Sequence, residues 1–202
     1  MKKAIVTGAT GFIGASFVNF LISKGIDVIA LGRKPLVKIK ASRREKIKHA
    51  NYINLDIKEI YFLNKKIEEI KWEVGEECIF FNLAWGGNDR LSDLDIKAQM
   101  QNVIWSVAAL EESIKIGCSR FIQIGTMEEA FAHKYLKLDH HKDNQYNRHL
   151  IYSIAKIVAK KALHLKALNS GIHYNSVEYY NDNIILANNS KLLLNYKILL
   201  II

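Results

Sequence analysis

A tyrosine and a lysine stand four residues apart in the stretch YSIAK, as Tyr152 and Lys156. Residues four apart on an α-helix lie on one face, so this spacing would place the phenol and the ammonium group side by side. A neighbouring ammonium group stabilises phenolate and lowers the pKa of a phenol, which is ordinarily about 10. The pair could therefore transfer a proton, although two surface side chains can have the same spacing.

A glycine-rich stretch, TGATGFIG at residues 7–14, follows a short apolar run near the N-terminus. Gly8, Gly11 and Gly14 have the spacing of a dinucleotide-binding loop. In such a loop the first glycine permits a tight turn, the second lets the backbone approach a pyrophosphate, and the third allows close packing of helix on strand. The helix that follows would direct its free N–H groups at the phosphates.

The end of the second apolar run, LGRK at residues 31–34, bears on the choice between NAD and NADP. NAD-binding proteins carry an acidic residue there, about 20 residues after the loop, which binds the ribose 2′-hydroxyl. This chain has Gly32, Arg33 and Lys34, and a guanidinium group suits the 2′-phosphate of NADP. The sequence thus predicts NADP or NAD as cofactor and favours NADP, with Arg33 as a ligand. Alternatively, Arg33 and Lys34 only begin a basic run.

Elements that could hold these residues alternate along the chain. The sequence pattern predicts strands at residues 3–6, 27–32, 52–55, 78–84 and 120–125, and helices at residues 11–25, 58–73, 93–117 and 148–171. Several of the strands are apolar almost throughout, as in sheets that are covered on both faces. The alternation predicts an α/β fold with a doubly wound parallel sheet of the Rossmann type.

The helices near residues 93–116 and 148–169 are apolar nearly all round. A helix that packs only on a sheet has a polar outer face. The second apolar face predicts a homodimer that forms through these two helices. A substrate domain that packs on them is the alternative.

Composition argues against several classes of protein. The 202 residues carry a formal net charge of +9, much of it in residues 33–49. That run has no interleaved aromatic residue, so we predict a solvated loop beside an anionic ligand and no nucleic-acid partner. No apolar stretch approaches the roughly 20 residues of a membrane span, and the N-terminus lacks a signal-peptide pattern. Cys78 and Cys118 are predicted to be buried free thiols, which is typical of a cytoplasmic protein.

The motifs TGATGFIG and YSIAK together resemble the extended branch of the short-chain dehydrogenase/reductase superfamily, the NAD-dependent epimerase/dehydratase family. Other landmarks follow in that family's order. The stretch LDI resembles its adenine-contacting dipeptide, and NLAW at residues 82–85 resembles its H-L-A-A stretch, with Asn82 in place of histidine. The resemblance implies that these residues contact the cofactor: Gly8, Thr10, Gly11, Phe12, Ile13, Gly14, Arg33, Asp56, Ile57, Leu83, Ala84, Trp85, Asn102 and Lys156.

The resemblance also implies catalytic roles and a class of reaction. Tyr152 would transfer a proton, Lys156 would lower its pKa and bind the nicotinamide ribose, and Thr126 would hold the substrate oxygen. Related 4,6-dehydratases carry Asp-Glu where this chain has Met127 and Glu128, and methionine cannot protonate a leaving hydroxyl. The implied activity is therefore a nucleotide-sugar epimerase or 4-keto-sugar reductase. Glu128 or Glu129 is a candidate acid, but we predict solvated carboxylates at both positions.

The remaining features qualify this assignment. His133, His140, His141 and His149 fit no ligand spacing, so we predict no metal site. Residues 1–177 are predicted to form the NAD(P)-binding domain, and residues 178–202 an atypical tail without an assigned fold. The resembled proteins continue into a small C-terminal substrate domain, which we expect to be largely missing here. A catalytically silent dinucleotide-binding module, or a truncated remnant, is therefore the alternative function.

Overall fold

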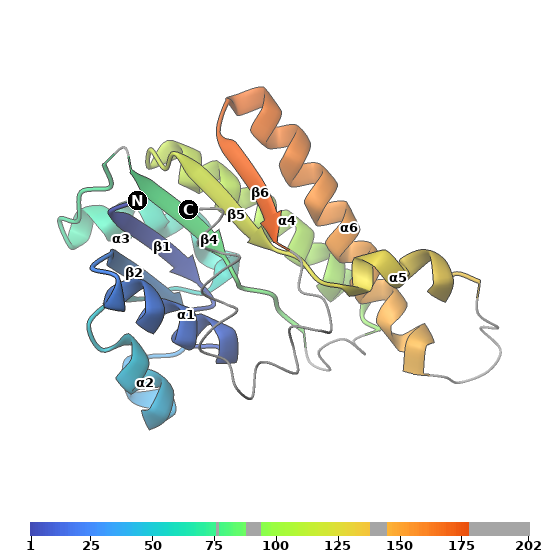
Figure 1. Cartoon of the computed structure of the whole chain (residues 1–202), viewed down its shortest axis with the longest axis horizontal. Coiled ribbons are helices and arrows are strands. Elements are labelled where there is room, and N and C mark those ends of the chain that lie inside the picture. The colour runs from blue at the N-terminus through green and yellow to red at the C-terminus, as the bar shows by residue number, and fades with distance from the viewer. Residues whose placement is uncertain (76, 88–93, 138–144, 178–202) are drawn as a thin grey trace.

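The computed structural model describes residues 1–75, 77–87, 94–137 and 145–177. Within them, six strands form one sheet in the order β3-β2-β1-β4-β5-β6, and every neighbouring pair is parallel (Figure 1). The strands are β1 (Lys3–Thr7), β2 (Asp27–Gly32), β3 (Asn51–Asn54), β4 (Cys78–Asn82), β5 (Arg120–Ile124) and β6 (His173–Val177). The helices are α1 (Phe12–Ser23), η1 (Leu36–Lys38), α2 (Ala41–Ile47), η2 (Ile57–Phe62), α3 (Leu63–Glu69), α4 (Ile96–Lys115), α5 (Glu128–Tyr135) and α6 (Gln145–Ser170).

This strand order confirms the predicted doubly wound Rossmann sheet. The chain adds strands in one direction from β1 to β3 and then returns to the other side of β1 with β4. Connections that diverge on either side of two neighbouring strands leave a crevice at the carboxyl ends of those strands. The crevice between β1 and β4 is thus the place where this fold can accept a ligand. The predicted tail, residues 178–202, lies outside the described residues.

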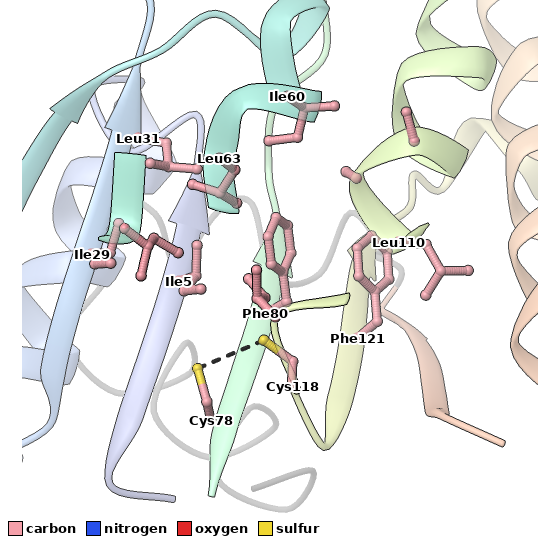
Figure 2. Packing of buried hydrophobic residues seen from close by; sticks show 14 of the residues in the cluster. Ile5, Ile29, Leu31, Ile60, Leu63, Cys78, Phe80, Leu110, Cys118 and Phe121 are labelled. Carbon is pink, nitrogen blue, oxygen red and sulfur yellow. Dashed lines mark hydrogen bonds between the residues drawn. The ribbon is translucent and has the colours of Figure 1, made fainter. Parts of the chain in front are cut away.

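Two apolar layers hold the sheet between its helices. Helices α1 and α2 pack on one face, and α3, α4 and α6 pack on the other. On the second face the rings of Phe80 and Phe121 stack with centroids 5.2 Å apart (Figure 2). On the first face Phe17 of α1 meets Phe81 edge to face at 4.8 Å. Neighbouring residues of β4 therefore bury their rings on opposite faces, which explains why the strand is apolar up to Asn82.

The two cysteines lie side by side in the core. Cys78 begins β4, Cys118 precedes β5, and their sulfur atoms are 3.7 Å apart (Figure 2). Both are free and buried, as predicted. The hydrogen bond with Cys78 and burial together raise the pKa of the Cys118 thiol. The thiols therefore act as small apolar groups in this core.

Three elements differ from the predicted pattern. The basic run was predicted as a loop, but it contains η1 and α2, and its Ile39 and Ile47 are buried. The predicted helix at residues 58–73 is instead the 3₁₀ segment η2 followed by the shorter α3. Helix α5 was not predicted at all. Helices α2, α3 and α5 have at most eight residues each, too few to show a repeated 3.6-residue pattern.

Candidate cofactor and catalytic site

The glycine loop joins β1 to α1 at the crevice, and its geometry requires glycine. Gly8 has a φ of +65°, and its carbonyl oxygen accepts a hydrogen bond from the Gly11 N–H at 2.9 Å. A Cβ atom at Gly14 would lie 2.1 Å from the same oxygen, and one at Gly8 would lie 2.9 Å from the Ala84 nitrogen. The loop is therefore packed against both its own helix and the chain after β4.

A pocket of about 500 Å³ opens beside this loop. Nine of the predicted cofactor ligands line it: Gly8, Thr10, Gly11, Arg33, Asp56, Ile57, Leu83, Ala84 and Trp85. The other predicted ligands do not. Phe12 and Ile13 are exposed at the start of α1, Gly14 is buried in the turn, and Asn102 and Lys156 lie behind Trp85 and its loop. The structure thus brings most of the predicted set together around one cavity.

The lining also includes further cations, most of them in the basic run that was predicted to lie beside an anionic ligand. Besides Arg33, the pocket is lined by Lys34, Lys38, Lys40, Arg43 and Lys58. The Arg43 guanidinium donates a hydrogen bond from Nη1 to the Thr10 carbonyl at 3.2 Å, which ties α2 to the glycine loop. Asp56 is the one carboxylate among the lining residues, and its Oδ1 accepts the backbone N–H of Lys58 at the start of η2. The pocket, with six cationic side chains and one carboxylate in its lining, therefore suits an anion.

A buried polar network fixes the chain that lines the pocket beyond β4. The Thr7 hydroxyl donates to Asn82 Oδ1 at 2.6 Å and accepts the N–H groups of Leu83 and Ala84. The Asn82 amide in turn donates to Gln123 on β5 at 2.8 Å. Asn82, which replaces the expected histidine, thereby links β1, β4 and β5.

The loop after β4 is held from α4. Asn102 accepts the Gly86 N–H at 2.7 Å and donates to the Gly86 carbonyl at 2.9 Å, while the Trp85 indole donates to Gln99 at 2.8 Å. Asn102 and Gln99 are both buried. A direct contact between Asn102 and a cofactor stays a prediction, because the Asn102 amide hydrogen-bonds the backbone of Gly86 in this structure.

Tyr152 and Lys156 lie on successive turns of α6 beside the end of β5. The Thr126 side chain hydrogen-bonds Tyr152, which brings together the three predicted catalytic residues. Burial raises the pKa of Tyr152 to about 12, and the Thr126 hydrogen bond only partly offsets this. The predicted lowering by Lys156 is therefore not found in this structure. The reason is geometric: Lys156 Nζ donates to the Ile124 carbonyl at 2.9 Å and lies 5.7 Å from the centre of the Tyr152 ring.

Lys156 itself is strongly perturbed. Its side chain is buried, with 6% of the residue exposed. Burial lowers its pKa from 10.5 to about 7, although the nearby Glu129 carboxylate acts in the opposite direction. A lysine whose pKa lies near neutrality, next to a tyrosine, is typical of a site that handles protons.

The prediction of solvated carboxylates after Thr126 is wrong. Helix α5 turns Glu128 and Glu129 inward, and they are only 7% and 9% exposed. Glu128 accepts the Tyr135 hydroxyl and lies 3.3 Å from the Nδ1 atom of His149. Glu129 accepts the Thr126 N–H at 2.9 Å and so braces the residue that holds Tyr152. An N-terminal position on a helix suits both carboxylates.

The histidines do not assemble in the described part of the chain. His133 is exposed on α5, whereas His149 points at Glu128; His140 and His141 lie outside the described residues. Among the described residues no three His, Cys, Asp or Glu side chains form a group that could hold a metal ion. Within the same residues no helix is long and apolar enough to cross a membrane.

Comparison with known proteins places these features in a family. Residues 4–182 match the NAD dependent epimerase/dehydratase family. The Escherichia coli protein YbjS is 28% identical over 141 residues, which are 70% of this chain and 37% of that protein. UDP-glucose 4-epimerase of Thermotoga maritima superposes with a TM-score of 0.63 at 24% identity, over 88% of this chain and 55% of that one.

The UDP-Glc/GlcNAc 4-epimerase of Campylobacter jejuni gives a TM-score of 0.65 at 14% identity, over 89% of this chain and 54% of its own. At these identities the structural likeness shows the fold. The chain spans about half the length of these solved structures and about a third of YbjS. The family match covers most of the chain, including the glycine loop and the Tyr152–Lys156 pair. The chain belongs to the NAD dependent epimerase/dehydratase family.

Proposed function

We propose that this chain binds NADP or NAD and transfers hydride at a carbon of a nucleotide sugar, as an epimerase or a 4-keto-sugar reductase. One observation carries the proposal: the hydrogen-bonded Thr126–Tyr152 pair, with Lys156 one turn further, lies next to a glycine-lined pocket at the β1/β4 crevice. Solved structures with the same fold are UDP-glucose and UDP-N-acetylglucosamine 4-epimerases, some of them in complex with NAD. A UDP-sugar is therefore the first substrate to test.

The residues of the pocket fit a dinucleotide. The glycines leave the backbone of residues 8–11 open to a pyrophosphate, and the N-terminus of α1 supplies N–H groups and a favourable dipole. Asp56 and Ile57 line the same pocket as Arg33 and would contact the adenosine of the dinucleotide. A bound nicotinamide would supply the hydride acceptor or donor.

The side chains of this chain would transfer the proton that accompanies the hydride. Oxidation of a sugar hydroxyl releases a hydride from carbon and a proton from oxygen, and reduction takes up both. Because burial raises the pKa of Tyr152 to about 12, its phenol keeps its proton at neutral pH and can donate it to a ketone oxygen. Thr126 would hold that oxygen beside the phenol. In the oxidative direction the same oxygen returns its proton to the phenolate.

The choice of NADP over NAD rests on the charge around the pocket. Six cationic side chains and one carboxylate line it, and Arg33 and Arg43 carry guanidinium groups. A guanidinium binds phosphate through two hydrogen bonds and stays charged at all physiological pH values. These groups support binding of the 2′-phosphate of NADP.

The alternative is a dinucleotide-binding module without turnover. Two observations favour it: the Lys156 ammonium faces an indole and a backbone carbonyl, and the pKa of Tyr152 is raised by burial. Such a protein would bind the cofactor and leave every nucleotide sugar unchanged.

One experiment separates these functions. The purified 202-residue chain is titrated with NADPH and NADH while its melting temperature is followed. A ligand at about 100 times its Kd stabilises the folded state by about 2.7 kcal/mol, and we expect the larger rise with NADPH. UDP-glucose or UDP-N-acetylglucosamine is then added with the oxidised cofactor, and the near-ultraviolet absorbance of reduced nicotinamide is recorded. The sugar is also analysed for its 4-epimer, because an epimerase returns the hydride and leaves no net reduced cofactor. Absorbance or an epimerised sugar supports hydride transfer. Stabilisation with neither favours the silent module, and no stabilisation contradicts both functions.

The second apolar face of α4 and α6 supports a homodimer. The two helices pack against each other, yet Ile104 on α4 and Val158, Leu165 and Leu168 on α6 expose 42–66% of their surface. We propose that a second copy of this chain covers them. Light scattering is expected to give a dimer for the native chain and a monomer for Leu165→Asp. Leu136→Asp, at an exposed position after α5, should stay dimeric, and a monomeric native chain would contradict the proposal.

A further inference from the structure

Trp85 joins the pocket to the Tyr152–Lys156 pair. Its side chain lines the pocket, and Lys156 Nζ lies over its ring, 3.8 Å from the ring centre. Tyr152 meets the same indole edge to face, with centroids 6.0 Å apart and planes at 82°. Neither Tyr152 nor Lys156 is itself among the residues that line the pocket. The indole therefore stands between the pocket and the two residues.

The indole is fixed in this position by buried groups. Its N–H donates to Gln99, whose side chain belongs to the core side of α4. The next residue, Gly86, is held through both its N–H and its carbonyl by Asn102. A Cβ atom at Gly86 would lie 3.2 Å from Asn102 Oδ1, so the loop is closely packed there. The side chains of Gln99 and Asn102 thus orient the Trp85 ring, the first directly and the second through the backbone of Gly86.

The Lys156 ammonium needs such a partner. It has left water almost completely, and burial of a positive charge strongly favours the neutral amine. Around it lie the Ile124 carbonyl at the end of β5, Glu129 on α5, Tyr152 on its own helix, and Trp85 after β4. Glu129 also pairs with Lys160 at 3.6 Å, so its charge is shared between two lysines. The negative face of an indole attracts a cation most strongly when both are shielded from water.

We propose that Trp85 is a positioning residue of the proposed active site, whose indole face holds the Lys156 ammonium charged and in place beside Tyr152. This inference rests on the proposed function, because it gives Trp85 a part in the proton chemistry. The carbonyl of Ile124 accepts one N–H of the ammonium group. The face of the Trp85 ring stabilises the positive charge from another side. A ligand in the pocket would contact Trp85, which would connect it to Lys156.

The test is the ionisation of Lys156 in the cofactor-free protein. Lysine labelled with ¹³C at Cε is titrated by NMR, and the Lys156 signal is identified by its loss in Lys156→Met. In Trp85→Leu, which removes the aromatic face, we expect the pKa of Lys156 to fall by about one unit below that of the native chain. In Trp85→Phe, which keeps a weaker aromatic face, the fall should be smaller. An unchanged pKa in a folded Trp85→Leu protein overturns the inference.

A second measurement keeps the shape of the ring. Replacing tryptophan by a polyfluorinated tryptophan withdraws electron density from the face of the indole, while the side chain at position 85 still fills its site. We expect the pKa of Lys156 to fall in steps with the number of fluorine atoms, whereas a merely structural indole would leave it constant. This measurement stands in if Trp85→Leu does not fold.

Neither measurement requires cofactor or substrate, so two failures can be told apart. A constant pKa overturns the role of Trp85 even if the chain turns over a nucleotide sugar. A falling pKa in a chain that never transfers hydride contradicts the proposed function and leaves the contact between Trp85 and Lys156 established.

Discussion

At about pH 6 the free energy of unfolding of Lys156→Met is expected to exceed that of the native chain by on the order of 2–4 kcal/mol. Burial lowers the pKa of Lys156 from 10.5 to about 7 in the folded chain. That difference corresponds to on the order of 4–5 kcal/mol of stability. Methionine fills a similar space without a charge. It loses the hydrogen bond to Ile124 and the contact with Trp85, and these losses reduce the gain in stability by about 1–2 kcal/mol.

The sign of this effect depends on pH. Between about pH 7 and pH 10 the unfolded chain keeps the Lys156 proton and the folded chain releases it, so native stability rises with pH. Below about pH 7 both states are protonated and the folded chain bears the whole cost of the buried charge. Above about pH 10 both are neutral and the cost is gone. The advantage of Lys156→Met should therefore be largest in acid and vanish toward about pH 10.

Urea unfolding at several pH values checks this expectation. Lys161→Met is the matched control, because Lys161 is exposed on the same helix and its loss should change stability by less than about 0.5 kcal/mol. An advantage of Lys156→Met that is absent in acid, or that does not change with pH, would contradict the burial of a charged lysine. A confirmed advantage would mean that this position sacrifices stability, as active sites commonly do.

The parts of the fold that the sequence could predict depend on local chemistry. Strands buried on both faces, such as β4, require continuous apolar runs. The loop at Gly8 needs a positive φ, and the close approach at Gly14 leaves no room for a Cβ atom. Both requirements are met by residue types within a few positions of each other. For this reason the glycine loop, the doubly wound parallel sheet and the position of Tyr152 and Lys156 on one helix were predicted correctly.

The parts that the sequence could not predict depend on distant contacts. Asn82 bonds Thr7 and Gln123, which are 75 and 41 residues away, and nothing in the stretch NLAW indicates either partner. Cys78 and Cys118 touch across 40 residues for the same reason. Burial of Glu128 follows from Tyr135 and His149, and His149 comes from another helix. The environment of a site, and hence its pKa values, emerges only when the sheet brings such residues together.

The signal for one such contact was nevertheless present. Trp85 stands where the resembled proteins carry alanine, and a larger side chain next to a cofactor pocket must displace something or contact something new. The structure shows that it contacts Lys156 and Tyr152. Burial raises the pKa of Tyr152, and Lys156, whose ammonium lies over the indole, does not offset this rise. A departure from a family pattern beside the proposed catalytic pair thus marks where a new contact forms.

Tyr152→Phe is expected to lower the rate of hydride transfer from a UDP-sugar by about 10²–10⁴-fold, because phenylalanine cannot exchange a proton with the substrate oxygen. The ring that contacts Trp85 is kept, and only the hydroxyl and its hydrogen bond with Thr126 are lost. Cofactor binding, measured as the rise in melting temperature, should therefore be unchanged. Thr126→Val is the matched control, since it removes the same hydrogen bond and leaves the phenol in place, and we expect a smaller loss.

The pH dependence gives this prediction its sharpest form. Oxidation of a sugar hydroxyl requires phenolate, and the phenolate fraction of a tyrosine with a pKa of about 12 grows about tenfold for each pH unit below that value. The native rate of oxidation should therefore rise with pH, and the small residual rate of Tyr152→Phe should not follow that rise. A phenylalanine variant with the native rate and the native pH profile would show that another group moves the proton. Glu128, buried beside His149, would then be the next residue to replace.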